Sequence, residues 1–341
     1  MTADPALETL LLPFRQGLLQ WPGDGVLFLR ARDGAPLHEL PLPGLVCEQT
    51  FKPDADALSA AGLSLNIDGS RKYPLVMVLP PRQRDEARAL LARAVSLVAP
   101  GGRVLASQGN NEGARSSEKD LESIAGTLHT MNKNRCRAFW TEPLPGLTDP
   151  RLATEWLALD AVRRIEDERF VSRPGVFAWD RIDTASALLA RHLPERLAGD
   201  VADLGAGFGY LSVELLTRCK GIRNLHLYEA EARALDLARL NLASFEKQIP
   251  IEYHWHDVTR GLPRSYDAIV TNPPFHTGGG REQPDIGRRF IAVAAESLTV
   301  HGELWLVANR HLPYEATLQG RFSRIRTVAQ EAGFKIIHAN R

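Results

Sequence analysis

Short apolar segments and amphipathic helices alternate through the second half of this 341-residue chain, and this order limits the folds available to it. The expected strands are residues 201–206, 225–231, 251–257, 266–272 and 302–308. The expected helices are residues 210–219, 232–245 and 288–298. Such alternation predicts an α/β fold with a doubly wound parallel sheet covered by helices on both faces. Ligands of these sheets bind at the carboxyl ends of the strands.

The first of these strands ends in a glycine-rich loop, DLGAGFG at residues 203–209. Gly205, Gly207 and Gly209 allow a ligand to approach the backbone, and the following helix offers unpaired N–H groups at its start. A dinucleotide-binding loop has the pattern GxGxxG, whereas Tyr210 and Leu211 follow the last glycine here. This departure favours a ligand that lacks a diphosphate.

An acid ends each of the next two expected strands. Glu229 comes about 20 residues after the glycine loop, where a carboxylate accepts hydrogen bonds from ribose hydroxyls. Asp257 ends the third strand, where a carboxylate can accept from an adenine amino group. Each acid alone is typical of a helix cap or a solvated strand end. Together with the glycines, in this order, they predict a nucleoside-binding site.

The fourth expected strand ends in NPPFH, residues 272–276. An exocyclic amine of a nucleobase is a weak nucleophile because its lone pair is delocalised into the ring. The Asn272 side-chain oxygen and the Pro273 carbonyl, held in place by the fixed φ of proline, could accept the amine hydrogens and turn the lone pair toward an electrophile. Positioning would then supply most of the rate. We expect catalysis from Asn272, Pro273 and Phe275, and substrate binding from Pro274, Phe275 and His276, with Phe275 stacking on the base.

The first half contains three segments whose sequence pattern is similar to that of three segments in the second half. Residues 73–82, 86–98 and 100–108 match residues 266–275, 288–300 and 301–309 in order and kind. Leu79 stands where Asn272 stands in the second copy, and Arg82 stands where Phe275 stands. An internal duplication in which the first copy kept the fold and lost the site explains this pattern. A chance match of apolar segments and Pro-Pro pairs is the alternative.

The second half resembles the class I S-adenosylmethionine-dependent methyltransferases, which have a loop like DLGAGFG, acids like Glu229 and Asp257, and NPPF in this order. More narrowly, it is similar to the bacterial ribosomal RNA guanine-N2 methyltransferases of the RsmC/RlmG type. The closer features are RPGVFAWDRID at 173–183, NPPFH, and GELWLVANRHLPY at 302–314. The likeness covers residues 170–341 well and the first 165 in outline.

The resemblance implies two tandem Rossmann-like methyltransferase domains with seven-stranded sheets. Residues 1–165 would form a degenerate domain that positions RNA or supports its neighbour, and residues 166–341 the catalytic domain. S-adenosylmethionine is the implied cofactor, and Phe177 and Asp183 would form the pocket for its methionine end. The implied cofactor residues are Phe177, Asp183, Asp203, Gly205, Gly207, Gly209, Glu229, Asp257 and Asn272, and Arg310 joins the substrate contacts.

The implied reaction is methylation of the N2 amine of a guanine in ribosomal RNA, with 16S RNA as the first expectation. Guanine-N2 methylation of 23S RNA, adenine-N6 methylation and glutamine-N5 methylation of a protein stay open, because each of these reactions methylates a planar, conjugated NH2 group. A ribosome-assembly factor that binds RNA without catalysis is a further alternative. The filled C-terminal motif positions speak against it.

The composition, 44% hydrophobic and 24% charged, is typical of a globular protein, and 41 basic residues balance 41 acidic ones. Any RNA-binding surface must therefore be local. Candidates are Arg281, Arg288, Arg289 and residues 321–326, with ordinary solvated faces as the alternative.

The spacing of Cys47, Cys136 and Cys219 predicts reduced thiols and no metal site. No segment approaches the roughly 18 apolar residues of a membrane span. We expect a cytoplasmic monomer without a membrane partner.

Overall fold

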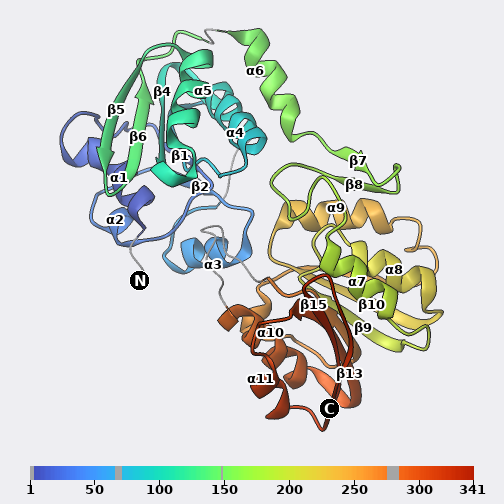
Figure 1. Cartoon of the computed structure of the whole chain (residues 1–341). Coiled ribbons are helices and arrows are strands. Elements are labelled where there is room, and N and C mark those ends of the chain that lie inside the picture. The colour runs from blue at the N-terminus through green and yellow to red at the C-terminus, as the bar shows by residue number, and fades with distance from the viewer. Residues whose placement is uncertain (1–3, 66–70, 147–148, 275–283) are drawn as a thin grey trace. The chain divides into compact units, whose positions relative to one another are not determined.

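The computed structural model describes residues 4–65, 71–146, 149–274 and 284–341. The chain divides into two compact units, Met1–Ala161 and Val162–Arg341, whereas the sequence placed the division at 165/166 (Figure 1). Among the described helices, none is long and apolar enough to cross a membrane. The three cysteines are buried and unpaired, as their spacing predicted.

The second unit contains a seven-stranded sheet in the order β11-β10-β9-β12-β13-β15-β14. Its strands are β9 (Ala198–Leu204), β10 (Gly221–Glu229), β11 (Ile251–Trp255), β12 (Tyr266–Thr271), β13 (Leu298–Asn309), β14 (Arg324–Glu331) and β15 (Phe334–Asn340). The first five in this order are parallel, and β15 is antiparallel to β13 and β14. The chain runs outward from β9 to β11 and returns to β12 on the other side. The strand order therefore reverses between β9 and β12, where such sheets bind ligands.

Helices cover this sheet on both faces, which confirms the doubly wound expectation (Figure 1). One apolar cluster joins the sheet to α7 (Thr184–His192), α8 (Tyr210–Arg218) and α9 (Ala232–Leu242). A second cluster joins the other face to α10 (Pro284–Glu296) and α11 (Glu315–Gln319). A two-stranded ribbon of β7 (Arg163–Ile165) and β8 (Phe170–Ser172) precedes α7.

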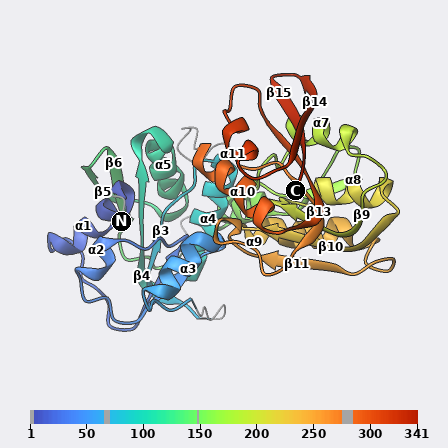
Figure 2. The same ribbon diagram turned by 90° about the horizontal axis from the view of Figure 1, so that it is seen from below.

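The first unit has a six-stranded sheet in the order β2-β1-β3-β4-β6-β5. The strands are β1 (Val26–Leu29), β2 (Leu45–Glu48), β3 (Tyr73–Val78), β4 (Val98–Gly109), β5 (Leu128–Lys133) and β6 (Cys136–Thr141). One face packs against α1 (Pro5–Arg15), α2 (Ala35–His38) and α3 (Lys52–Ala60). The other packs against α4 (Arg84–Leu97), α5 (Ala114–Ala125) and α6 (Pro150–Leu157). Figure 2 shows α4 and α5 on the opposite side of the sheet from α1 and α2.

The two sheets share an irregular strand pairing. In β3 and β4, Tyr73 pairs with Val98 and Leu75 pairs with Arg103. In β12 and β13, Tyr266 pairs with Leu298 and Ala268 pairs with Glu303, so the same bulge recurs at the same place. Chance similarity of apolar segments does not account for a shared bulge. The register supports duplication, and the mixed sheets of both units agree with two tandem methyltransferase-like domains.

Within the described residues, the first sheet has six strands where seven were expected. Its order matches that of the second sheet from β10 to β14, and a single parallel bridge between Val46 and Ser64 stands in the place of the edge strand β11.

Candidate active site

An open cleft lies at the carboxyl ends of β9 and β12, where the strand order reverses. The cleft is lined by Phe177, Ala178, Asp183, Ser186, Gly205, Ala206, Gly207, Phe208, Tyr210, Leu211 and Asn272. Three segments that are distant in sequence, the one before α7, the glycine loop and the end of β12, therefore form one site.

The glycine loop needs all three glycines for conformation, and two of them for separate further reasons. Gly205, Gly207 and Gly209 have φ values of +73°, +56° and +87°, in the left-handed region that L side chains rarely adopt. A Cβ on Gly209 would lie 3.2 Å from the Cβ of Ala238, so this glycine allows the loop to pack on α9. Nothing lies within 4 Å of a Cβ on Gly207, which leaves the backbone open to a ligand.

Glu229 closes the site behind the loop. Its Oε2 accepts a 2.7 Å hydrogen bond from the Gly207 N–H, and its Oε1 accepts one of 2.8 Å from the Glu231 N–H. Burial raises the pKa of Glu229, and these backbone donors oppose the rise. The carboxylate is thus fixed against the loop, and it does not itself line the cleft. The expected contact with ribose stays a prediction.

Asp203 lies beneath the loop and does not line the cleft. Its side chain is fully buried at the end of β9, and its Oδ2 accepts a 2.8 Å hydrogen bond from Ser212 at the start of α8. Its Oδ1 has no partner among the described residues. Burial raises the pKa of Asp203 to about 7 against the effect of the Ser212 hydrogen bond. In this structure Asp203 holds α8 below the glycine loop.

Asn272 is fixed through its side-chain nitrogen. Nδ2 donates to Asp183 Oδ2 and to Ser186 Oγ, both at 2.9 Å. Asp183 caps α7, because the same Oδ2 accepts from the Ser186 backbone N–H at 2.8 Å. The Asn272 side-chain oxygen is buried and has no partner among the described residues. Asn272 therefore lines the cleft with its side-chain nitrogen occupied and its side-chain oxygen unpaired among the described residues.

The other expected site residues lie at varied distances from this cleft. Phe177 is 67% exposed and lines it. Asp257 caps a short 3-10 helix through bonds to Thr259, and Arg310 is an exposed residue after β13; neither lines the cleft. Pro273 is buried and Pro274 is exposed. Phe275, His276 and Arg281 lie outside the described residues.

Two helix arginines that were expected as anion-binding candidates pair with acids. Arg288 pairs with Asp285 at 2.8 Å, and Arg289 pairs with Glu296 at 3.2 Å.

Two residues of the site were missed in the sequence. Ser186 holds Asn272, and Asn241 on α9 ties the glycine loop to β8 by bonding both Phe208 and Val171. A capping motif at residues 183–186 could have indicated Ser186, since an N-cap acid bonds the third residue of its helix. No local pattern indicates the long-range bonds of Asn241.

The first unit presents a modified copy of this site. By strand register, Arg30 corresponds to Gly205 and Gln49 to Glu229. Arg30 keeps the positive φ of the glycine at +50°, and its guanidinium lies 3.5 Å from the carbonyl of Leu79, the counterpart of Asn272. Gln49 donates to the Ala31 carbonyl at 2.6 Å. In the first unit the Arg30 side chain therefore reaches from the end of β1 to the end of β3. At the same place in the second unit, Gly205 has no side chain.

Comparison with known proteins shows which family this chain is similar to. The family model described as "Methyltransferase small domain" matches residues 167–338. The ribosomal RNA small subunit methyltransferase C of Alteromonas mediterranea is 30% identical over 77% of this chain and 72% of its own length. The protein of the same name from Pseudomonas paraeruginosa is 31% identical over 79% of this chain and 80% of its own. The chain belongs to the ribosomal RNA small subunit methyltransferase C family.

A solved structure of the family supports the two-unit architecture. The T. thermophilus 16S rRNA N2 methyltransferase RsmC, in complex with AdoMet and guanosine, has a TM-score of 0.80 and 25% identity, and the match covers 99% of this chain and 92% of that one. Membership in the RsmC family confirms the resemblance drawn from the glycine loop and NPPFH. It also confirms the expected fold of two tandem methyltransferase-like domains.

Proposed function

We propose that this chain transfers the methyl group of S-adenosylmethionine to the exocyclic N2 amine of a guanine in 16S ribosomal RNA, with Asn272 as the residue that orients the amine. The observation that carries the proposal is the amide of Asn272, fixed through its nitrogen by Asp183 and Ser186 with its oxygen left without a partner. The RsmC relatives are named for the same RNA, and the solved T. thermophilus RsmC holds AdoMet and guanosine.

Methylation of the guanine amine needs hydrogen-bond acceptors that orient the amine more than it needs a strong base. The guanine amine donates one hydrogen to the Asn272 oxygen and the other to the Pro273 carbonyl, and the nitrogen lone pair then lies out of the base plane. S-adenosylmethionine, when bound, would supply the electrophilic methyl group that this lone pair attacks, and its sulfur would keep the electrons of the broken bond. The nitrogen becomes cationic, and its extra proton leaves to water. Positioning of the two reactants accounts for most of the rate. The transfer itself needs no metal.

Different residues around the cleft are proposed to contact different parts of the cofactor. The open backbone at Gly207 and the start of α8 receive the nucleoside, and Glu229 accepts from the ribose hydroxyls. Phe177 and Asp183 receive the methionine end. Asp257 stays the proposed partner of the adenine amine: Thr259 uses its Oδ1, and its Oδ2 lies 3.6 Å from Arg260 Nε. Asp203 contributes indirectly: it does not contact the cofactor, but it holds Ser212 beneath the glycine loop.

Phe275, His276 and Arg310 are proposed to contact the target guanosine or its flanking RNA. Phe275 would stack on the base, a contact worth about 1–3 kcal/mol in single-stranded recognition. Pro274 follows the acceptor carbonyl and is exposed, so it can pack against the base from the edge of the site.

The first unit is proposed to bind no cofactor and to position RNA or support the catalytic unit. Arg30 in place of Gly205 brings a guanidinium to the position that a nucleoside would need, and Leu79 in place of Asn272 cannot accept an amine hydrogen. Titration of the whole chain with S-adenosylhomocysteine should therefore give one site per chain. Two sites of similar affinity would overturn this assignment.

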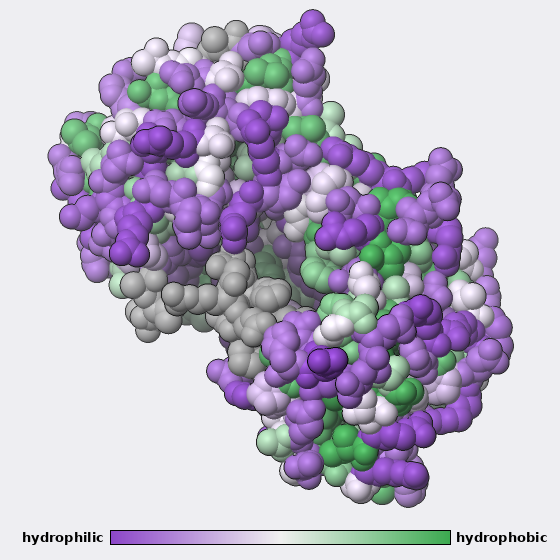
Figure 3. All heavy atoms as spheres, in the orientation of Figure 1, coloured by the Kyte–Doolittle hydropathy of each residue, from purple (hydrophilic) through white to green (hydrophobic). Residues whose placement is uncertain are grey.

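A cytoplasmic monomer is the proposed state of the chain. The visible face in Figure 3 is mostly hydrophilic, with hydrophobic residues in small scattered groups. Scattered apolar residues are normal on monomers, whereas a stable interface needs a contiguous patch. Sedimentation of the purified chain tests the oligomeric state.

Methyl transfer to ribosomal RNA tests the function. Small and large ribosomal subunits from a strain that lacks the gene are incubated with the full chain and labelled S-adenosylmethionine, and the RNA is digested to nucleosides. We expect the label in N2-methylguanosine from 16S RNA. Label in 23S RNA, in methyladenosine or in ribosomal protein would assign one of the alternative substrates instead.

A further inference from the structure

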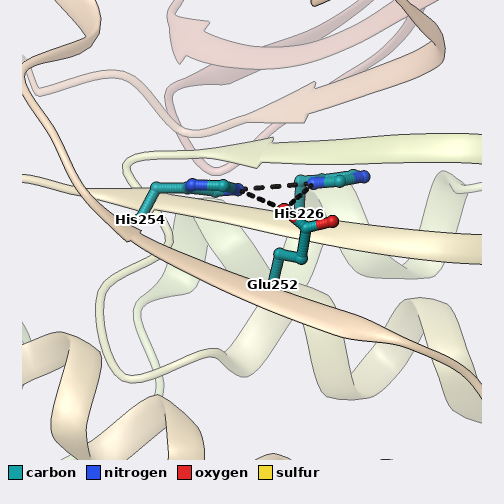
Figure 4. A group of neighbouring side chains, drawn as sticks. All are labelled: His226, Glu252 and His254. Atoms are coloured by element: carbon teal, nitrogen blue, oxygen red, sulfur yellow. Dashed lines mark hydrogen bonds and ion pairs between the residues drawn. The ribbon is translucent and has the colours of Figure 1, made fainter. Parts of the chain in front are cut away.

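A second cluster of chemically reactive side chains lies away from the cleft, on β10 and β11. In the part of the chain that the structure describes, His226, Glu252 and His254 form a group whose possible ligand atoms all lie within 4.8 Å of one another (Figure 4). None of these residues lines the cofactor cleft. The proposed methyl transfer uses none of them.

The strand register brings the three side chains together. His226 on β10 pairs directly with Glu252 on β11, and His254 follows Glu252 by two residues. Side chains two apart on a strand share a face, so Glu252 and His254 both lie beside His226. Figure 4 shows the two imidazole rings and the carboxylate converging on one point. The cluster thus spans the edge strand and its neighbour.

The separations suit a tetrahedral ion. His226 Nδ1 lies 3.3 Å from His254 Nε2, and each of these nitrogens lies 3.6 Å from Glu252 Oε2. In a tetrahedral zinc site with metal–ligand bonds of about 2.0–2.2 Å, neighbouring ligand atoms lie roughly 3.3–3.6 Å apart. At 3.6 Å the carboxylate is too distant for a good hydrogen bond to either ring.

One arrangement without an ion also has to be considered. A single shared proton can link the two nitrogens without an ion, but it leaves Oε2 of Glu252 outside the bond. The other oxygen, Oε1, lies 3.5 Å from Arg264.

We propose that His226 Nδ1, His254 Nε2 and Glu252 Oε2 bind one Zn²⁺ ion that ties the edge strand β11 to β10. Two imidazoles and one carboxylate form a donor set that favours zinc and related transition ions over magnesium or calcium. Glu252 is half-exposed, so the ion has a route from solvent and a fourth position for water. The ion would fix the edge strand next to β10, which ends at Glu229.

Zinc titration of the full chain tests the site. The protein is stripped with a chelator, and Zn²⁺ is then titrated in competition with a chromophoric chelator. Glu252→Gln and His254→Gln remove one ligand each. His129→Gln is the matched control, because His129 also pairs with a carboxylate, that of Glu142, but no third possible ligand among the described residues joins them. Far-ultraviolet circular dichroism checks the fold, and the half-exposed Glu252 carries the smaller risk of misfolding.

The expected result is one Zn²⁺ per chain, at least about tenfold weaker binding in both cluster variants, and unchanged binding in His129→Gln. Zinc should also raise the melting temperature of the wild-type chain and of His129→Gln, but not of the cluster variants. Equal zinc affinity in the wild type and a folded Glu252→Gln, or no stoichiometric binding by the wild type, would overturn the proposal.

Discussion

Asn272 at the end of β12 and Asp183 at the start of α7 are joined by a 2.9 Å hydrogen bond across 89 positions of sequence. The bond fixes the orientation of the Asn272 amide, because an amide has its donor on one side and its acceptor on the other. A cap residue of one helix thereby orients a side chain at the end of a strand.

Ser186→Ala should lower the rate of methyl transfer about 5- to 10-fold, because it removes one of two acceptors that hold the Asn272 nitrogen. Cofactor affinity should change little. Single-turnover rates for Ser186→Ala, Asn272→Ala and the double variant form a cycle that checks this. If Ser186 acts through Asn272, its loss costs nothing further in the Asn272→Ala background. Additive losses would assign Ser186 a role of its own.

The alanine variants of Gly207 and Gly209 should fail in different ways. Both force an L side chain into the left-handed region, so this strain is common to the pair. Gly209→Ala also crowds Ala238 and should lower the free energy of unfolding by about 1–3 kcal/mol more than Gly207→Ala does. Gly207→Ala meets open space and should mainly weaken S-adenosylhomocysteine binding. Denaturant melts and calorimetric titration measure the two effects, and a reversed pattern contradicts the assignment.

Glu229→Gln should weaken cofactor binding about 10- to 100-fold, since hydrogen bonds to a charged acceptor are worth about 1.5–3 kcal/mol. Its pKa is raised by burial, so wild-type affinity should fall as the pH drops toward that raised value and the carboxylate becomes protonated. Glu231→Gln is the control, because the Glu231 side chain bonds Arg233 at the start of α9, whereas the Glu229 side chain bonds Gly207 of the glycine loop. Titrations between pH 5 and 8 should give a slope in the wild type that Glu229→Gln lacks; identical slopes would count against the ribose contact.

Asp203→Asn should remove a pH dependence of the free energy of unfolding that burial of Asp203 causes in the wild type. The pKa of Asp203 is about 7 in the fold and 3.8 in its ordinary state, so between these values the folded chain binds one more proton than the unfolded chain. Stability from this group is therefore fully present below about pH 4 and is lost as the pH rises to 7, by a few kcal/mol in order of magnitude. Chemical melts should show that this loss is absent from Asp203→Asn. An equal pH slope in both proteins would exclude a buried, protonatable Asp203.

Local patterns in the sequence were sufficient for the five parallel strands, since apolar runs and glycine punctuation are local properties. They missed β14, which is mostly exposed, and β15, which is placed by its pairing with the distant strand β13. The family resemblance also implied a seventh strand in the first unit, where the described residues form a single bridge between Val46 and Ser64.

The sequence predicted those site residues that belong to a recognisable motif. The glycine loop and Asn272 belong to recognisable motifs, and both line the cleft. The role of Asp203 was not accessible, because nothing in DLGAGFG indicates that its first residue turns inward to Ser212. The pairing of Asn272 with Ser186 and the meeting of His226 with Glu252 depend on how strands and helices pack, which a linear pattern does not contain.

The rate of methyl transfer by Asn272→Ala tests the central claim most directly. Single-turnover transfer from labelled S-adenosylmethionine to small-subunit particles is measured for the wild type and the variant, with cofactor affinity measured in parallel. The account predicts a loss on the order of 100-fold or more in the transfer rate, the scale for one well-aimed polar group at a reacting centre, with cofactor affinity within a few fold of the wild type. A near-normal transfer rate in a variant that still binds cofactor would contradict it.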